Sequence, residues 1–78
     1  MKIICLYPSI HFVLKAEKAL KAKGFRPNLI PVPKEISGDC GMALEIGEEE
    51  LTQLKILGLS PEAIYRRTDH GFERLLDS

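Results

Sequence analysis

The chemistry available to this sequence centres on its thiols. Cys40 ends residues 33–40 (Pro-Lys-Glu-Ile-Ser-Gly-Asp-Cys), a segment whose proline, glycine and aspartate are typical of a loop. Gly38 and Gly41 lie on either side of the cysteine, and their small size would let another protein's active site approach closely. A loop thiol in this setting is suited to accepting a group and handing it on.

The remaining cysteine and the two histidines give weaker signals for chemistry. Cys5 lies within an apolar run and is expected to be a small buried hydrophobe. A Cys5–Cys40 disulfide is not expected, because bridging needs Cα atoms within about 7 Å and the strand register would place the two further apart. His70 is expected to be exposed, whereas His11 is either an exposed helical residue or part of a site. No Cys or His pair has metal-ligand spacing, so we expect no metal.

Hydrophobic periodicity in the first half predicts a strand, a helix and a second strand. Residues 2–7 form a nearly continuous apolar run, which is typical of a central strand covered on both faces. A helix is expected over residues 10–23, with Ser9 as its N-cap. Residues 29–32 read as a strand, and the proline within it lacks a ladder donor, which indicates an edge position.

The second half repeats this order. Residues 41–46 alternate between apolar and polar side chains and predict a strand, and an acid-rich first turn opens a helix over residues 48–57. Residues 63–67 read as a fourth strand. Residues 68–78 are expected to form a C-terminal tail that could contain a short helical turn around Phe72.

This order predicts a single α+β domain over residues 1–67. Two right-handed crossovers give the ferredoxin-like βαββαβ arrangement, an antiparallel four-stranded sheet with strand order 4-1-3-2 and both helices on one face. The other face would carry apolar side chains, which either the tail or another chain must cover. A homodimer is therefore one expected outcome.

The predicted topology brings Cys40 close to a helix terminus. The first and third strands are antiparallel neighbours, so the end of the first strand, at Tyr7 to Ser9, lies beside Cys40 and Gly41. The unpaired N–H groups that begin the first helix would stabilise a thiolate there, by about 0.3–1 kcal/mol, which lowers the thiol pKa by at most about 0.7. His11 and Lys34 could reach the same region. This activation of the thiol is modest, which suits a residue that accepts and passes on a group better than a nucleophile that must break a strong bond.

Composition narrows the class of partner. Eleven basic residues balance eleven acidic ones among 78, so no electrostatic signal points to nucleic acid or to an anionic membrane. The first residues lack the pattern of a secretion signal, and no apolar stretch approaches the roughly 20 residues that span a bilayer. A cytoplasmic location with reduced thiols is therefore expected.

Residues 31–41, Pro-Val-Pro-Lys-Glu-Ile-Ser-Gly-Asp-Cys-Gly, resemble the signature of the selenium/sulfur carrier protein-like family. Members of that family show a Pro-x-Pro-basic-x-Ile-Ser-x-x-Cys-Gly stretch. The apolar strand that runs into Pro8-Ser9 and the helix that follows are similar too. The resemblance covers about residues 2–65.

The resemblance implies a protein that holds sulfur or selenium on the loop cysteine, as a persulfide or perselenide. Cys40 would then be the carrier residue, Gly41 completes the motif, and Ser9, Lys34 and Ser37 are further matching positions. The implied partners are a donor protein and an acceptor protein. No cofactor is implied, and the chain would be a carrier more than a stand-alone enzyme.

Two alternatives remain open from the residues themselves. One is a non-catalytic regulatory or interaction module that uses the open apolar face of the sheet. The other, weaker, is a thiol redox sensor based on Cys40.

Overall fold

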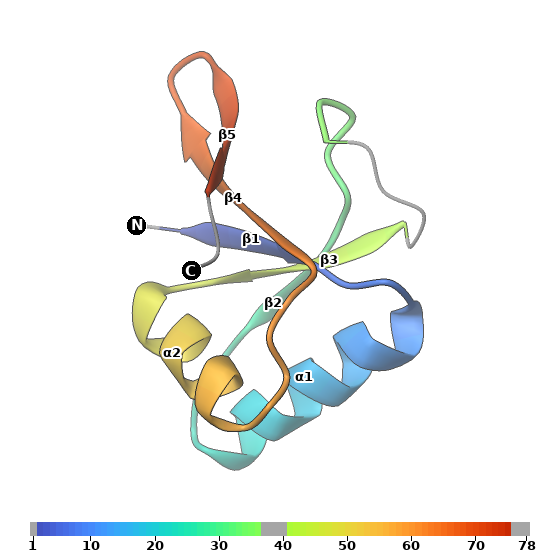
Figure 1. Cartoon of the computed structure of the whole chain (residues 1–78), viewed down its shortest axis with the longest axis vertical. Helices are drawn as coiled ribbons and strands as arrows, with labels where there is room; N and C mark the ends of the chain where they lie inside the picture. The colour runs from blue at the N-terminus through green and yellow to red at the C-terminus, as the bar shows by residue number, and fades with distance from the viewer. Residues whose placement is uncertain (1, 37–40, 76–78) are drawn as a thin grey trace.

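A computed structural model describes residues 2–36 and 41–75 of the chain (Figure 1). Two helices and five strands follow one another in the order β1 (Ile3–Leu6), α1 (Ile10–Ala22), β2 (Asn28–Pro31), β3 (Met42–Ile46), α2 (Glu48–Ile56), β4 (Ala63–Thr68) and β5 (Gly71–Leu75).

The five strands form one antiparallel sheet with the order β2-β3-β1-β4-β5. The first four strands have the predicted order, and β2, which ends in Pro31, lies at an edge as its missing N–H requires. The class, two helices with an antiparallel sheet, is therefore confirmed. The number of strands is not: the sheet has five strands rather than four and thus departs from the strict ferredoxin-like arrangement.

The fifth strand replaces the expected tail. Gly71 to Leu75 forms β5, which pairs with β4 from Ile64↔Leu75 to Thr68↔Gly71, so the helical turn considered around Phe72 is wrong. The spacing of Phe72, Leu75 and Leu76 fits a helical face, but a strand lets Phe72 and Leu75 pack against opposite faces of the sheet. The expected boundary after residue 67 therefore falls inside a hairpin.

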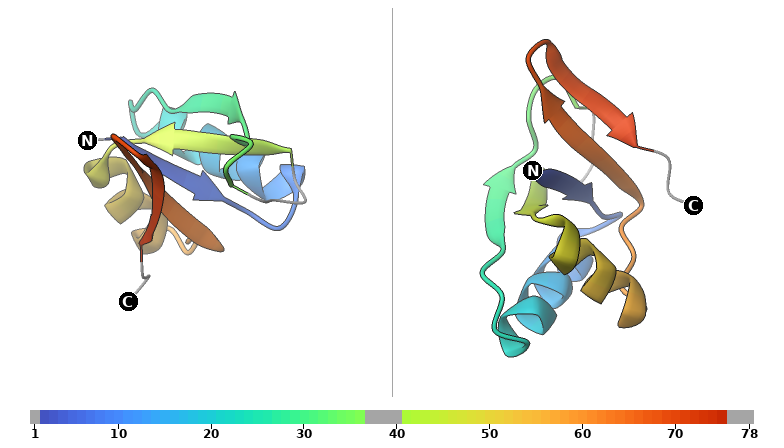
Figure 2. Two further views of the ribbon diagram at one scale, coloured as in Figure 1. Left: turned by 90° about the horizontal axis from the view of Figure 1, so that it is seen from above. Right: turned by 90° about the vertical axis from the view of Figure 1, so that its left-hand side faces the viewer.

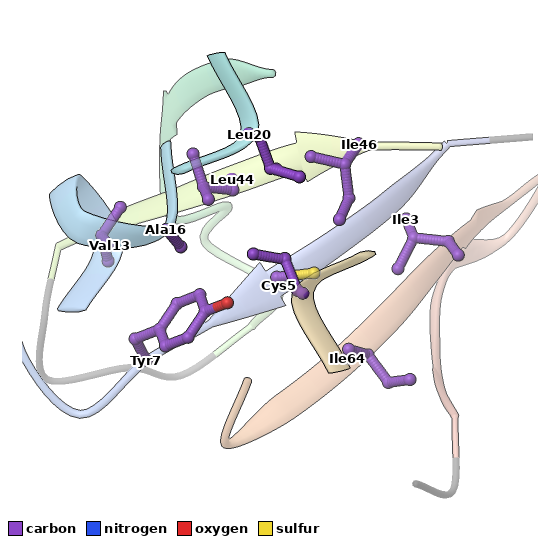
Figure 3. Packing of buried hydrophobic residues seen from close by; sticks show 10 residues of the cluster. Ile3, Cys5, Tyr7, Val13, Ala16, Leu20, Leu44, Ile46 and Ile64 are labelled. Carbon is purple, nitrogen blue, oxygen red and sulfur yellow. The ribbon is translucent and has the colours of Figure 1, made fainter. Parts of the chain in front are cut away.

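Both helices cover one face of the sheet, as predicted (Figure 2). Ile3, Cys5 and Tyr7 of the first strand and its extension point towards them. They meet Val13, Ala16 and Leu20 of α1 and Leu54 of α2, and all seven side chains are buried (Figure 3). The buried helical residues recur every three or four positions, which places them on one stripe of α1.

The other face is covered by the chain itself. Ile4 and Leu6 of β1 pack there with Ala43 and with Ile36, which comes from the connection between β2 and β3. Phe72 of β5 packs against the same cluster. Ile4 and Leu6, on the face that the interaction-module alternative would leave open, are therefore covered.

The hairpin of β4 and β5 gives Arg66 and Arg67 a structural role. Both arginines lie on β4, which is an inner strand of the sheet. Arg66 pairs with Glu73 of β5, and the guanidinium of Arg67 lies 5.5 Å from the centre of the Phe72 ring. Both side chains thus hold β5 in place.

Ending the chain at Thr68 should therefore destabilise the fold and leave β4 as an unpaired edge. Loss of the partly buried Phe72 and Leu75 side chains should lower the free energy of unfolding by roughly 2–4 kcal/mol, as measured by urea denaturation. Light scattering should show self-association through the new edge. A truncated chain as stable and as dispersed as the full chain would contradict this role of β5.

Candidate functional site

The candidate site is the end of the sheet at which β2 and β3 are connected. The β2–β3 ladder ends at the pair Pro31↔Met42, and one further bond follows it: the Val32 N–H donates to the Gly41 carbonyl at 3.0 Å. The two ends of the connection are therefore held side by side by the backbone.

Ile36 anchors this connection from within. Its N–H donates to the Pro33 carbonyl at 3.0 Å, which closes a turn, and its side chain is only 4% exposed. The turn directs the side chain onto the sheet face formed by Ile4, Leu6 and Ala43. The sequence signal for this anchor is an apolar residue within an otherwise polar segment, and the anchor was not predicted.

Gly41 has a backbone conformation that favours glycine. Its φ is +75°, and within the described part of the chain a Cβ added there would meet no atom within 4 Å. The left-handed backbone is therefore what favours glycine at this position. Residue 41 thus turns the chain into β3 at the point where the connection ends.

The N-terminus of α1 lies at the same end of the sheet. β1 and β3 pair through Cys5↔Leu44, and extending that register by three residues brings Pro8 level with Gly41. Ser9 follows as the N-cap of α1, although its side chain makes no capping hydrogen bond. Figures 1 and 2 both show α1 and β3 beginning at this end. The N–H groups of the first helical turn are thus near the connection, as the topology predicted.

The predicted site residues fall into three groups. Gly41 and Ser9 lie at this end of the sheet, and His11 and Lys34 are both exposed, with no hydrogen bond or ion pair to each other or to the described ends of the connection. Cys40 and Ser37 lie outside the described residues, and their assignment stays a prediction.

Tyr7 fixes the end of β1 next to the candidate site, a role that was not predicted from the sequence. Its hydroxyl donates to the Leu59 carbonyl at 2.6 Å, which ties the end of β1 to the loop after α2. Burial, and to a lesser extent the neighbouring Cys5, raise the pKa of Tyr7, so the phenol stays protonated and remains a donor. A phenol that ends an apolar run is the available sequence signal.

Cys5 is buried, as predicted, among the residues that face the helices (Figure 3). Its strand partner is Leu44, and Gly41 lies three residues further along β3, or about 10 Å at the usual strand rise. That separation argues against Cys5 as a second thiol of the same site.

Within residues 2–36 and 41–75, no three His, Cys, Asp or Glu side chains are grouped closely enough to hold a metal ion. The same residues include no helix with the length and apolar character needed to cross a membrane.

A scan against family models matches residues 2–66 to the family described as Putative Se/S carrier protein-like. The match spans most of the chain and includes both ends of the β2–β3 connection. The chain therefore belongs to this family, which confirms the resemblance seen in residues 31–41. Searches of the curated proteins and of the solved structures gave no match.

The anchoring role of Ile36 gives a test of the site's architecture. Ile36→Ala should lower the free energy of unfolding by roughly 2–4 kcal/mol, because it leaves a cavity beneath the connection. Ile56→Ala is the matched control, since Ile56 is 71% exposed on α2 and should change stability by less than about 0.5 kcal/mol. Urea denaturation of both variants measures the difference, and equal effects would rule out Ile36 as an anchor.

Proposed function

We propose that this protein carries sulfur or selenium as a persulfide or perselenide on Cys40 and passes it to an acceptor protein. Membership of the Se/S carrier protein-like family over residues 2–66 carries the proposal. The bond between Val32 and Gly41 and the burial of Ile36 support it, because they fix both sides of residues 37–40 against the sheet.

The proposed transfer is an exchange reaction between two cysteines. The Cys40 thiolate attacks the outer sulfur of a donor cysteine persulfide; a new S–S bond forms at Cys40 while the donor's S–S bond breaks. The donor cysteine leaves as the thiolate and takes up a proton. One sulfur atom moves at its existing oxidation level, so no oxidant or reductant is needed, and delivery to the acceptor repeats the exchange in reverse.

The supporting residues have limited roles in this proposal. The N–H groups that begin α1 provide a partial positive charge at the same end of the sheet as Gly41, and this favours the thiolate only moderately. His11 and Lys34 are exposed and could meet a partner's groups, while Ser9 and Ser37 remain matching positions of the motif. A carrier needs no more than this, since its thiol must also give the group up.

Loading by a cysteine desulfurase tests the function directly. After incubation with the desulfurase and cysteine or selenocysteine, intact-mass measurement should show one added sulfur or selenium atom on the protein. Cys40→Ser should abolish the addition. Cys5→Ala is the matched control, because Cys5 is buried and its loss should leave loading unchanged in the folded fraction.

Two results would contradict the proposal: no added mass on the wild-type chain, or equal labelling of Cys40→Ser. A redox sensor is the remaining alternative for the same thiol. It requires faster alkylation by iodoacetamide than an ordinary thiol shows, so a pH profile centred near 8.5 would count against it.

A further inference from the structure

The exposed surface of α1 combines positive charge with apolar side chains. Residues 10–26 contain five basic residues and one acidic residue, although the whole chain is neutral. Lys15 and Lys18 are exposed, and the single acid, Glu17, is mostly buried and paired with Lys21 at 3.5 Å. Phe12 and Leu14 are 48% and 44% exposed on the same helix.

Three of these side chains point away from the protein's own core. Val13, Ala16 and Leu20 mark the inward stripe of α1, and at about 100° per residue Leu14, Lys15 and Lys18 fall on the opposite side. Nothing in the described fold uses them: Lys15 and Lys18 form no ion pair there. The apolar and basic side chains together make a surface of the type that protein interfaces use.

This surface begins beside the candidate site. Ser9 is the N-cap of α1, and the residue before it is level with Gly41, so Phe12 and Leu14 lie within the first two turns from that end of the sheet. Lys15 and Lys18 continue along the helix. A partner whose cysteine reaches the β2–β3 connection would extend over the start of α1, since two proteins that exchange a group between cysteines must be in direct contact.

We infer that the outer face of α1, formed by Leu14, Lys15 and Lys18 with Phe12 at its border, docks the persulfide-bearing donor protein through an acidic patch on the donor that surrounds its cysteine. The inference rests on the proposed function and adds the partner's surface chemistry to it. The lysines attract and orient the donor, and the Leu14 side chain beside them becomes buried when the proteins meet.

The experiment compares a protein donor with a small one. Initial rates of Cys40 loading are measured by mass spectrometry with persulfidated cysteine desulfurase and, separately, with glutathione persulfide. Lys15→Glu/Lys18→Glu should reduce kcat/KM for the desulfurase about tenfold at low salt, and the loss should shrink as salt screens the charges. Loading from glutathione persulfide should be unchanged, which also shows that the variant is folded.

Lys2→Glu/Arg74→Glu is the matched control. It makes the same change in net charge at two exposed residues outside α1, one directly before β1 and one on β5, and should leave both rates unchanged. Leu14→Ser tests the apolar part of the surface. It should lower kcat/KM for the desulfurase by a factor that does not vary with salt. Ile56→Ser, at an exposed residue of α2, is its control and should leave kcat/KM unchanged.

The outcomes separate this inference from the proposed function. Failure of both donors to load the wild-type chain counts against the carrier itself. If the wild type is loaded and Lys15→Glu/Lys18→Glu is loaded by the desulfurase at the same rate, the docking surface alone is overturned. The same holds if Lys2→Glu/Arg74→Glu loses as much of the desulfurase rate as Lys15→Glu/Lys18→Glu does. Sedimentation of the wild type with phosphatidylglycerol vesicles, lost in Lys15→Glu/Lys18→Glu, would overturn it in favour of a membrane surface.

Discussion

Burial of β1 on both faces is the constraint on which the rest of this small fold depends. Ile3 and Cys5 contact the helices, Ile4 and Leu6 contact the other layer, and all four are at most 8% exposed. A strand of four residues can be covered on both faces only if each face receives its own layer. The helices form one layer; on the other face Ile36 covers Ile4 and Leu6, and Phe72 of β5 packs against the same cluster.

The apolar run at residues 2–7 was sufficient to predict a central strand, and Pro31 was sufficient to predict an edge. Both features are local: an unbroken apolar run requires cover on both faces, and a proline cannot donate to a neighbouring strand, whatever the rest of the fold is. β5 was not predictable in the same way. The spacing of Phe72 and Leu75 is compatible with a helix or with a strand. The strand is favoured because, without β5, one edge of β4 would have no hydrogen-bonding partner and the sheet face of Ile4 and Leu6 would lack the Phe72 side chain.

The site was predictable to a similar degree. Antiparallel pairing of β1 with β3 brings Gly41 to the start of α1, and strand order alone implies this. The burial of Ile36 and the bond from Tyr7 to Leu59 depend on partners 30 or more residues away in the sequence, at Ile4, Leu6 and Leu59, so no local pattern reveals them. Cys40 and Ser37, outside the described residues, rest on the motif.

The hydrogen bond that joins the two ends of the β2–β3 connection separates the length of this segment from the register of the strands. Among the described residues, the hydrogen bond from Val32 to Gly41 is the last backbone bond between the two sides of the connection, just beyond the final ladder pair Pro31↔Met42. Residues inserted between Val32 and Gly41 need not shift the register of either strand. Each doubling of a loop's length costs only about 0.6 kcal/mol in closure entropy, so a longer connection would leave the pairing of β2 with β3 in register.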